Sequence, residues 1–156
     1  MIEVDIPGFG PVRLAHAVTD FTGTLSVDGS LLPGVREQLV RVSKLVTLHV
    51  LTADTFGKAR GELGGLDCEF HLLAGDDHDL QKERYVMQLD PEGVVALGNG
   101  NNDRRMLKAA RVGIAVCLQE GCARDALASA DILVTSANDA LDLILYPTRL
   151  KATLRF

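Results

Sequence analysis

The chain has 156 residues, of which 47% are hydrophobic and 4% aromatic, and its formal net charge is −5. This length suits one domain with a real core, so we expect a single domain over residues 1–156 built from α/β layers. The charge balance, without a basic block, disfavours nucleic acid as a partner. No apolar run approaches about 18 residues, and Glu3 and Asp5 stand where a signal peptide needs basic residues, so we expect a cytoplasmic protein without membrane contact.

The first third of the chain predicts a hairpin, a core strand, a flap and a helix. Apolar and acidic residues alternate over residues 2–6, and the alternation resumes at 12–14, which predicts a hairpin leading into a strand at 16–19. An Asp-Gly turn in the middle of residues 25–32 predicts a small hairpin flap. Pro33 suits the first turn of the helix that follows.

Strands and helices then alternate to the end of the chain. Apolar runs predict strands at 45–51, 68–73, 94–97, 112–116 and 132–134. Helical spacing predicts helices at 58–63, 80–89, 106–110, 121–129 and 137–145. Such alternation implies a mainly parallel sheet with right-handed crossovers. The mixed basic and apolar tail at 149–156 is expected to pack on the core or on a neighbouring molecule.

Asp20 ends the first core strand and is followed by a tight polar loop, Thr22-Gly23-Thr24. Ligands of open α/β sheets bind just outside such strand ends. Gly23 allows the backbone to turn so that successive N–H groups point at one anion. An aspartate beside such donors can attack phosphorus and form an aspartyl-phosphate, provided that a cation masks the charges. The alternative for this loop alone is a solvated, capping Asp20.

Further polar residues follow the other predicted strands. Thr52, before Ala53, stands between a strand and a helix start, where an anion would meet a hydroxyl and the positive end of a helix dipole; ordinary helix capping is the alternative. Lys82 lies early in a helix, where it opposes the dipole unless it has another task. Carboxylates, oxygen donors and one lysine at a single sheet edge suit Mg²⁺ and phosphate. The residues expected to converge are Asp20, Thr22, Thr52, Lys82, Asn99 and Asp103.

A dinucleotide-binding loop is another interpretation of Gly98-Asn99-Gly100. Its third glycine is missing, because Asp103 stands at that position, and no acidic residue lies at a convincing place beyond the next strand. A partial G-x-G motif is weak, so a dehydrogenase is disfavoured.

Taken together, the motifs resemble the haloacid dehalogenase (HAD) superfamily of phosphohydrolases, in order and spacing, from about Ala15 to Ala137. Three of them look most like the phosphorylation domain of P-type ATPases and its free-standing soluble relatives. They are Asp-Phe-Thr-Gly-Thr, Leu-Thr-Ala-Asp-Thr and Gly-Asn-Gly-Asn-Asn-Asp. The resemblance implies a three-layer, Rossmann-like core with a mainly parallel sheet.

The resemblance also implies roles for single residues. Asp20 would be the nucleophile, with Thr22 and Lys82 as the other catalytic residues, and Lys82 would hold Asp20 and the phosphate together. Phosphoryl oxygens would meet Thr52 and Ala53, together with the Gly23 backbone.

The implied Mg²⁺ would bind the Asp20 carboxylate, the Thr22 backbone carbonyl and the loop from Asn99 to Asp103. The pumps usually have Asp where Asn99 stands. Asp103 is then the expected carboxylate ligand, unless Asn99 binds through its carbonyl oxygen, and both alternatives stay open.

Thr22 is a second departure, because most phosphatases of this superfamily carry an acid–base Asp at that place. A threonine hydroxyl cannot act as a carboxylic acid near neutral pH, and a positioned acid–base contributes about 10²–10⁴-fold. We therefore expect slow hydrolysis or a long-lived phosphoenzyme.

The chain leaves no room for an inserted cap domain. The resemblance suggests that such members act on large substrates or take a cap from a neighbouring subunit, which makes a homo-oligomer one alternative. We expect an Mg²⁺-dependent phosphohydrolase that acts on a phosphorylated substrate through phospho-Asp20. The alternative is a catalytically weak regulatory module that binds phosphate or a phosphoprotein; a role beside a membrane transporter has only the pump-like motifs in its favour.

Overall fold

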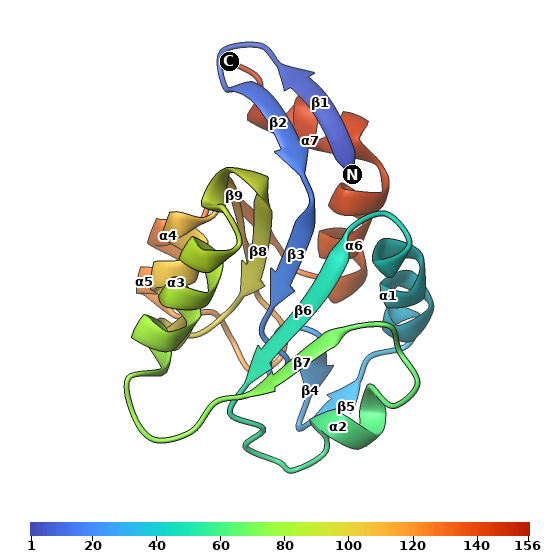
Figure 1. The fold of residues 1–156 in the computed structure, drawn as a ribbon, viewed down its shortest axis with the longest axis vertical. Helices are drawn as coiled ribbons and strands as arrows, with labels where there is room; N and C mark the ends of the chain where they lie inside the picture. Colours follow the sequence, from blue (N-terminus) through green and yellow to red (C-terminus); the bar gives the residue numbers. More distant parts are fainter.

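The centre of the molecule is a six-stranded sheet in the order β10-β9-β8-β3-β6-β7 (Figure 1). The computed structural model describes all residues, 1–156. The strands are β3 (His16–Thr19), β6 (Thr47–Thr52), β7 (Glu69–Leu72), β8 (Val94–Gly98), β9 (Val112–Val116) and β10 (Ile132–Val134). Every pairing in this sheet is parallel, so the predicted α/β class and mainly parallel sheet are confirmed.

Helices cover both faces of the sheet and complete three layers (Figure 1). One face carries α3 (His78–Gln88), α4 (Arg104–Ala109) and α5 (Arg124–Ser129). The other carries α1 (Val35–Ser43) and α6 (Ala137–Leu145), which pack on each other. None of the helices is long and apolar enough to cross a membrane.

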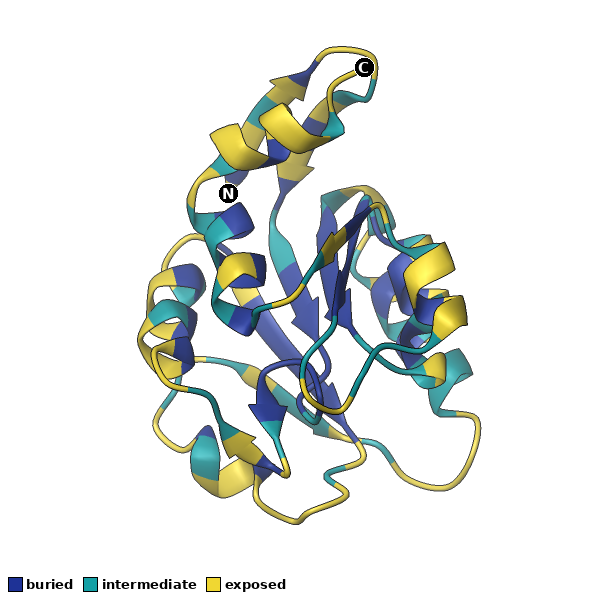
Figure 2. Cartoon of the chain, turned by 180° about the vertical axis from the view of Figure 1, so that it is seen from behind, coloured by how far each residue is buried: buried dark blue, intermediate teal, exposed yellow.

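The central strands are buried on both faces, as their continuous apolar sequence predicts (Figure 2). Alternate residues enter two different cores. Ala17 and Leu97 belong to the larger core with α1 and α6, whereas Val18 and Ala96 belong to the smaller core under α3, α4 and α5. Successive side chains of a strand point to opposite faces, so one strand serves both layers.

Two antiparallel hairpins flank the sheet, as predicted. The first joins β1 (Ile2–Ile6) to β2 (Gly10–Leu14) and leads directly into β3. The second is the flap, β4 (Ser26–Val27) and β5 (Ser30–Leu31), which follows the Asp20 loop. Between the flap and β6 the chain holds only α1, in agreement with the absence of an inserted cap.

The tail packs on the core, which was one of the two predicted alternatives, and the helix expected at 58–63 is shorter than predicted. The tail forms a regular helix, α7 (Pro147–Leu154), which packs against β1 through its apolar side. Pro147 occupies the first turn, where its missing N–H costs nothing, and Leu150 is fully buried. The helix expected at 58–63 is a single turn, α2 (Ala59–Glu62), because residues 53–58 form an irregular loop before it.

Candidate active site

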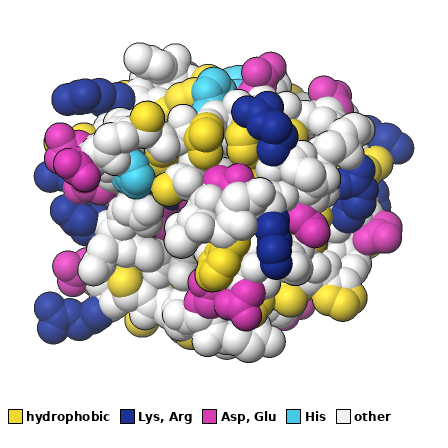
Figure 3. Space-filling model, turned by 90° about the horizontal axis from the view of Figure 1, so that it is seen from below, with side chains coloured by type: hydrophobic (Ala, Val, Ile, Leu, Met, Phe, Trp, Pro, Cys, Tyr) yellow, Lys and Arg dark blue, Asp and Glu magenta, His cyan; other side chains and the backbone are white.

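The order of the strands reverses beside β3, and the candidate residues gather at that point. The chain moves from β3 to β6 and β7, then returns to β8 on the opposite side of β3. Ligands of open parallel sheets bind at the carboxyl ends of strands beside such a reversal. Asp20 follows β3, Thr52 ends β6 and Asn99 follows β8. Figure 3 looks onto this end of the molecule, where acidic and basic side chains are interspersed with uncharged surface.

Lys82 is the centre of a buried ionic cluster. Its Nζ atom lies 2.9 Å from Asp20 Oδ1 and 2.6 Å from Asp103 Oδ1. Lys82 and Asp103 are fully buried, and Asp20 is 7% exposed. Lys82 opposes the dipole of α3 because of its early place in the helix, and α3 turns it inward between the two strand-end loops.

The cluster holds two carboxylates and one lysine, so its formal charge is −1. Burial raises the pKa of Asp20 from 3.8 to about 6, and the charge of Asp103 acts in the same direction, against the opposing effect of Lys82. Burial alone would lower the pKa of Lys82, but the carboxylates of Asp103 and Asp20 outweigh it and raise that pKa. Lys82 therefore stays protonated, and a cation near Asp20 would be favoured by the remaining negative charge.

Asp103 has no free carboxylate oxygen. Its Oδ1 accepts the Lys82 hydrogen bond, and its Oδ2 accepts hydrogen bonds from the backbone N–H groups of Asn99 and Gly100, both at 2.9 Å. The side chain passes so close to Gly98 that a Cβ atom there would lie 2.5 Å from Asp103 Cβ. The glycine thus allows Asp103 to fold inward and fix both the loop and Lys82.

A hollow of about 190 Å³ opens in front of Asp20, and we call it the Asp20 hollow. It is lined by Asp20, Thr22, Thr52, Ala53, Thr55, Asn99, Gly100 and Asn102. The Thr52 hydroxyl accepts a hydrogen bond from the Asp54 N–H at 2.9 Å, which leaves its proton free to donate into the hollow. Thr22 Oγ1 is buried and has no hydrogen-bond partner, an arrangement that favours a polar ligand here.

Asn99 and Gly23 form another wall of the site. The Asn99 side chain donates from Nδ2 to the Gly121 carbonyl at 3.1 Å and accepts from Thr24 Oγ1 at 3.2 Å. Gly23 has φ +79°, and a Cβ atom there would lie 2.5 Å from Asn99 Nδ2. Both the backbone angle and the close approach therefore require glycine at this position.

The chain is similar to known proteins in part of its sequence and in its fold. No family model matches the chain. An uncharacterised protein of Methanocaldococcus jannaschii is 52% identical over 62 residues, which cover 40% of this chain and 67% of that protein. The 3-deoxy-D-manno-octulosonate 8-phosphate phosphatase of Moraxella catarrhalis, solved with magnesium and phosphate, superposes with a TM-score of 0.71 at 17% identity, covering 89% of this chain and 90% of that one.

Two further solved structures extend the comparison. A protein of Streptomyces avermitilis described as a HAD family hydrolase gives a TM-score of 0.65 at 21% identity, with 85% of this chain and 83% of that chain covered. A zinc-transporting P-type ATPase gives 0.61 at 26% identity, covering 78% of this chain but only 20% of that one. The chain has the haloacid dehalogenase fold. The resemblance predicted from its motifs, including the likeness to P-type ATPases, is confirmed at the level of the fold.

Within this HAD fold, five of the eight predicted site residues line the Asp20 hollow: Asp20, Thr22, Thr52, Ala53 and Asn99. Gly23 packs against the Asn99 side chain instead. Lys82 and Asp103 do not line the Asp20 hollow but support Asp20 from the interior. Thr55, Gly100 and Asn102 also line the hollow and were not among the predicted site residues; of these, Asn102 is the one shared with a second hollow described below. The place of Asn102 directly before Asp103 in a polar strand-end loop was the available signal.

The residues that line the hollow can hold a divalent cation, but they supply only a few ligands. No three side chains of His, Cys, Asp or Glu gather in a metal-binding group. Asp20 is the one carboxylate that lines the hollow, and Asn99 adds an amide oxygen. Mg²⁺ prefers such oxygen ligands, keeps several waters and commonly uses one or two carboxylates together with substrate phosphate. The donor set therefore suits Mg²⁺ in combination with a phosphorylated ligand.

Proposed function

We propose that the protein is an Mg²⁺-dependent phosphohydrolase that acts through phospho-Asp20. The observation that carries the proposal is the position of Asp20, whose carboxylate faces a polar hollow while Lys82 holds Oδ1 from behind at 2.9 Å. The shared fold with phosphatases supports the same conclusion. Phosphoryl transfer asks a protein chiefly for positioning and charge neutralisation, which this arrangement offers.

In the proposed reaction, the Asp20 oxygen that does not bind Lys82 attacks phosphorus, the bond to the leaving oxygen breaks, and the departing alkoxide takes a proton from solvent water. The Thr52 hydroxyl donates to a phosphoryl oxygen, and the Ala53 and Gly23 backbone helps to orient the group. Lys82 keeps the attacking carboxylate in one orientation. Water then cleaves the phospho-Asp20 bond and releases inorganic phosphate.

The cation would be held by the Asp20 carboxylate, the Thr22 carbonyl and Asn99. When bound, it masks the repulsion between the carboxylate and the phosphate. Asn99 is the better candidate than Asp103 because Asn99 lines the Asp20 hollow, whereas Asp103 does not line it and is held by Lys82 and two backbone N–H groups. The two ends of this loop thus have different roles: Asn99 would bind the metal, and Asp103 binds Lys82.

Thr22 favours a second candidate function, a phosphate-binding or regulatory module with weak turnover. Asp20 is the one carboxylate lining the hollow, so no second carboxyl group stands ready to protonate the leaving group or activate water. A hydroxyl in that place costs about 10²–10⁴-fold in rate. The two candidates share phospho-Asp20 chemistry and differ in how long the phosphoenzyme lasts.

The test compares the wild type with Asp20→Asn, using p-nitrophenyl phosphate and Mg²⁺. The wild type should release phosphate at a rate below about 10 s⁻¹ and carry one phosphoryl group by mass spectrometry after acid quenching. Asp20→Asn should do neither, whereas Asp67→Asn, an exposed aspartate far from the hollow, should behave as wild type. Equal turnover in wild type and Asp20→Asn would refute the proposal. A trapped phosphoenzyme without steady turnover would favour the regulatory module.

A further inference from the structure

A second hollow, of about 350 Å³, adjoins the Asp20 hollow and has no role in the proposed phosphoryl transfer. We call it the Asp77 hollow. It is lined by Gly75, Asp76, Asp77, His78, Asp79, Asn101, Asn102 and Arg104, none of them hydrophobic. Asn102 lines both hollows, so a ligand whose phosphate meets Asp20 reaches the second hollow by passing this one side chain.

The flap lies on the side of the site opposite the Asp77 hollow. Its tip at Asp28 donates its N–H to Glu120 at 3.2 Å, and its carbonyl accepts from Lys58 Nζ at 3.2 Å. The flap is thus tied to the loops on both of its flanks. Figure 1 shows the flap and the loop before α3 on opposite sides of this end of the molecule. A substrate bound at Asp20 therefore finds open space lined by polar residues on the side of α3, and not on the side of the flap.

The charges of the Asp77 hollow are unbalanced. Asp79 is paired with Arg104 at 2.8 Å and with Arg105 at 3.0 Å. Asp76 and Asp77 are exposed and form no salt bridge. The Nε2 atom of His78 is buried and has no hydrogen-bond partner. The hollow thus offers two free carboxylates to whatever enters.

From this geometry we infer that the Asp77 hollow binds the leaving group of the substrate and selects a hydroxylated or amine-bearing group without negative charge. Hydroxyl and ammonium groups donate to carboxylates, whereas an additional carboxylate on the substrate would meet like charges. The inference rests on the proposed function, since it assigns the part of the substrate that departs from phosphorus. An apolar or aromatic leaving group would meet no hydrophobic side chain in the Asp77 hollow.

The N-terminus of α3 opposes this selection, because the positive end of a helix favours anions. That effect is modest at exposed sites and confined to the first turn. Here the helix's own Asp77 and Asp79 already lie at that end, so an entering anion meets the carboxylates as well as the dipole. We expect the free carboxylates to decide the preference.

Three esters with the same six-carbon frame test the inference: glucosamine 6-phosphate, glucose 6-phosphate and 6-phosphogluconate. Their leaving groups carry an amine, no charge and a carboxylate. The wild type should show kcat/KM about fivefold or more lower for 6-phosphogluconate than for glucose 6-phosphate, with the amine at least as good as glucose 6-phosphate. Calorimetric binding of the same three esters to Asp20→Asn with Mg²⁺ should give the same order without any need for turnover.

In the double variant Asp76→Asn/Asp77→Asn, the kcat/KM values for the three esters should become nearly equal. Asn suits the left-handed backbone of Asp77, φ +60°, so the change keeps the local fold. Asp5→Asn/Asp67→Asn is the matched control, since it removes the same charge from exposed positions away from the site and should preserve the discrimination. Equal or better use of 6-phosphogluconate by the wild type, or an unchanged ratio in the double variant, would overturn the inference. Asp20-dependent turnover of p-nitrophenyl phosphate in that same case would leave the proposed function standing.

Discussion

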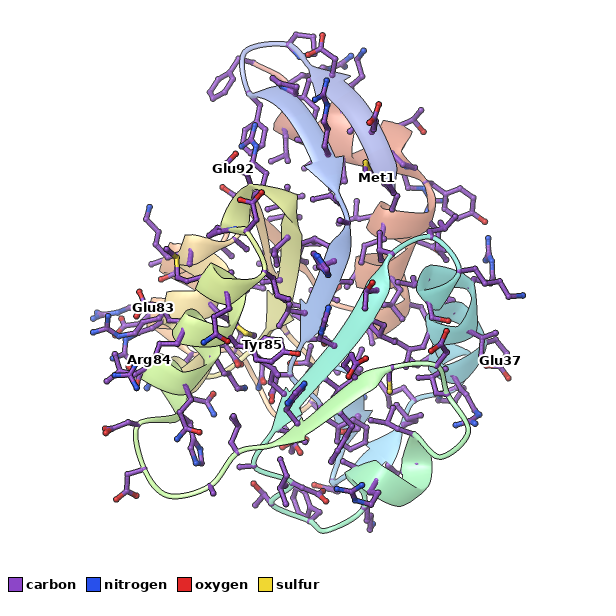
Figure 4. All side chains as sticks on the ribbon, viewed as in Figure 1. Met1, Glu37, Glu83, Arg84, Tyr85 and Glu92 are labelled. Carbon is purple, nitrogen blue, oxygen red and sulfur yellow. The ribbon has the colours of Figure 1, made fainter.

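Helix α3 presents two polar side chains to the sheet, Lys82 and Tyr85, and each enters a different buried cluster. Lys82 joins Asp20 and Asp103 in the ionic cluster at the carboxyl ends of the strands. Tyr85, less than one turn further along, points from α3 toward the strands (Figure 4). Its hydroxyl lies 2.9 Å from His49 Nδ1 and 2.7 Å from His71 Nε2, and His49 Nε2 lies 3.0 Å from His16 Nδ1.

These two clusters bury polar groups in opposite ways. The ionic cluster keeps its charges and balances most of them, which suits the proposed binding of phosphate and a cation. In the His–Tyr cluster a charge on His49 is disfavoured: burial lowers the pKa of His49 from 6.5 to about 4, and a positive charge on the neighbouring His16 or His71 would act in the same direction. Neutral rings can share protons along such a chain without the desolvation cost of an ion. The comparison suits the first cluster to the proposed chemistry and the second to fastening α3 to the sheet.

Lys82→Met gives the largest expected effect, because it leaves two buried carboxylates facing each other. Removing one partner of a buried ionic cluster costs about 3–5 kcal/mol of unfolding free energy. Urea denaturation at pH 7 measures this loss. The loss should shrink toward pH 5 as one of the carboxylates takes up a proton. Lys108→Met, on the exposed side of α4, is the matched control and should cost under about 0.5 kcal/mol. A loss of less than about 1 kcal/mol for Lys82→Met would contradict the ionic account.

The pH dependence of stability should separate the two clusters by sign. His49 has a folded-state pKa of about 4, below its ordinary 6.5, so the unfolded chain binds more protons and stability is lost as pH falls from about 6.5 to 4. Asp20 has a folded-state pKa of about 6, above its ordinary 3.8, so the folded chain binds more protons and stability is lost as pH rises through 3.8 to 6. The two slopes oppose each other within one window.

Two variants each isolate one of these pH dependences. The free energy of unfolding is measured by urea denaturation in the presence of a chelator. Asp20→Asn removes the falling contribution, so stability should rise by about 1–3 kcal/mol from pH 4 to 6.5, a range that allows for solvent screening. His49→Gln removes the rising contribution, so stability should fall with pH over the same interval. Parallel curves for the two variants would show that at least one group does not titrate as described.

Tyr85→Phe tests the neutral cluster at a smaller scale. It removes one hydroxyl and leaves His49 and His71 each without that partner, which costs about 1–2 kcal/mol. Because no ion is left unpaired, this loss should stay below that of Lys82→Met. Tyr146→Phe, whose residue is 41% exposed, controls for the loss of a tyrosine hydroxyl and should be nearly neutral. A loss in Tyr85→Phe equal to that in Lys82→Met would remove the distinction between the clusters.

The two clusters also differ in how far sequence predicted them. The ionic cluster follows from local rules: Asp20 and Asp103 stand in polar loops after apolar strands, and parallel strands bring such loops together. The same rules of alternation gave the sheet and its layers. They could not tell that Asp103 turns inward, since that depends on Gly98 leaving space for its side chain and on two backbone N–H groups reaching it.

The His–Tyr cluster was invisible in the sequence. His16, His49 and His71 each look like ordinary strand residues, and Tyr85 like part of an apolar helix face. Only the register of the sheet, which pairs Val18 with His49 and Leu51 with His71, sets the three rings on one face beneath α3. Long-range register is a property of tertiary packing, so a single sequence gives no local signal for it.

Asn99→Asp gives the smallest expected effect and sharpens the comparison by adding a charge to the ionic site alone. Asp cannot donate to the Gly121 carbonyl as Asn99 Nδ2 does, so the metal-free protein should lose some stability. A second carboxylate at the hollow should tighten Mg²⁺ binding about fivefold, measured as a lower Mg²⁺ concentration needed to raise the unfolding temperature by the same fixed amount. Asn138→Asp on α6 makes the same charge change away from the hollow and should leave Mg²⁺ protection unaltered. Unchanged Mg²⁺ protection in Asn99→Asp would mean that the cation does not bind at residue 99, and the different roles of Asn99 and Asp103 would fall with it.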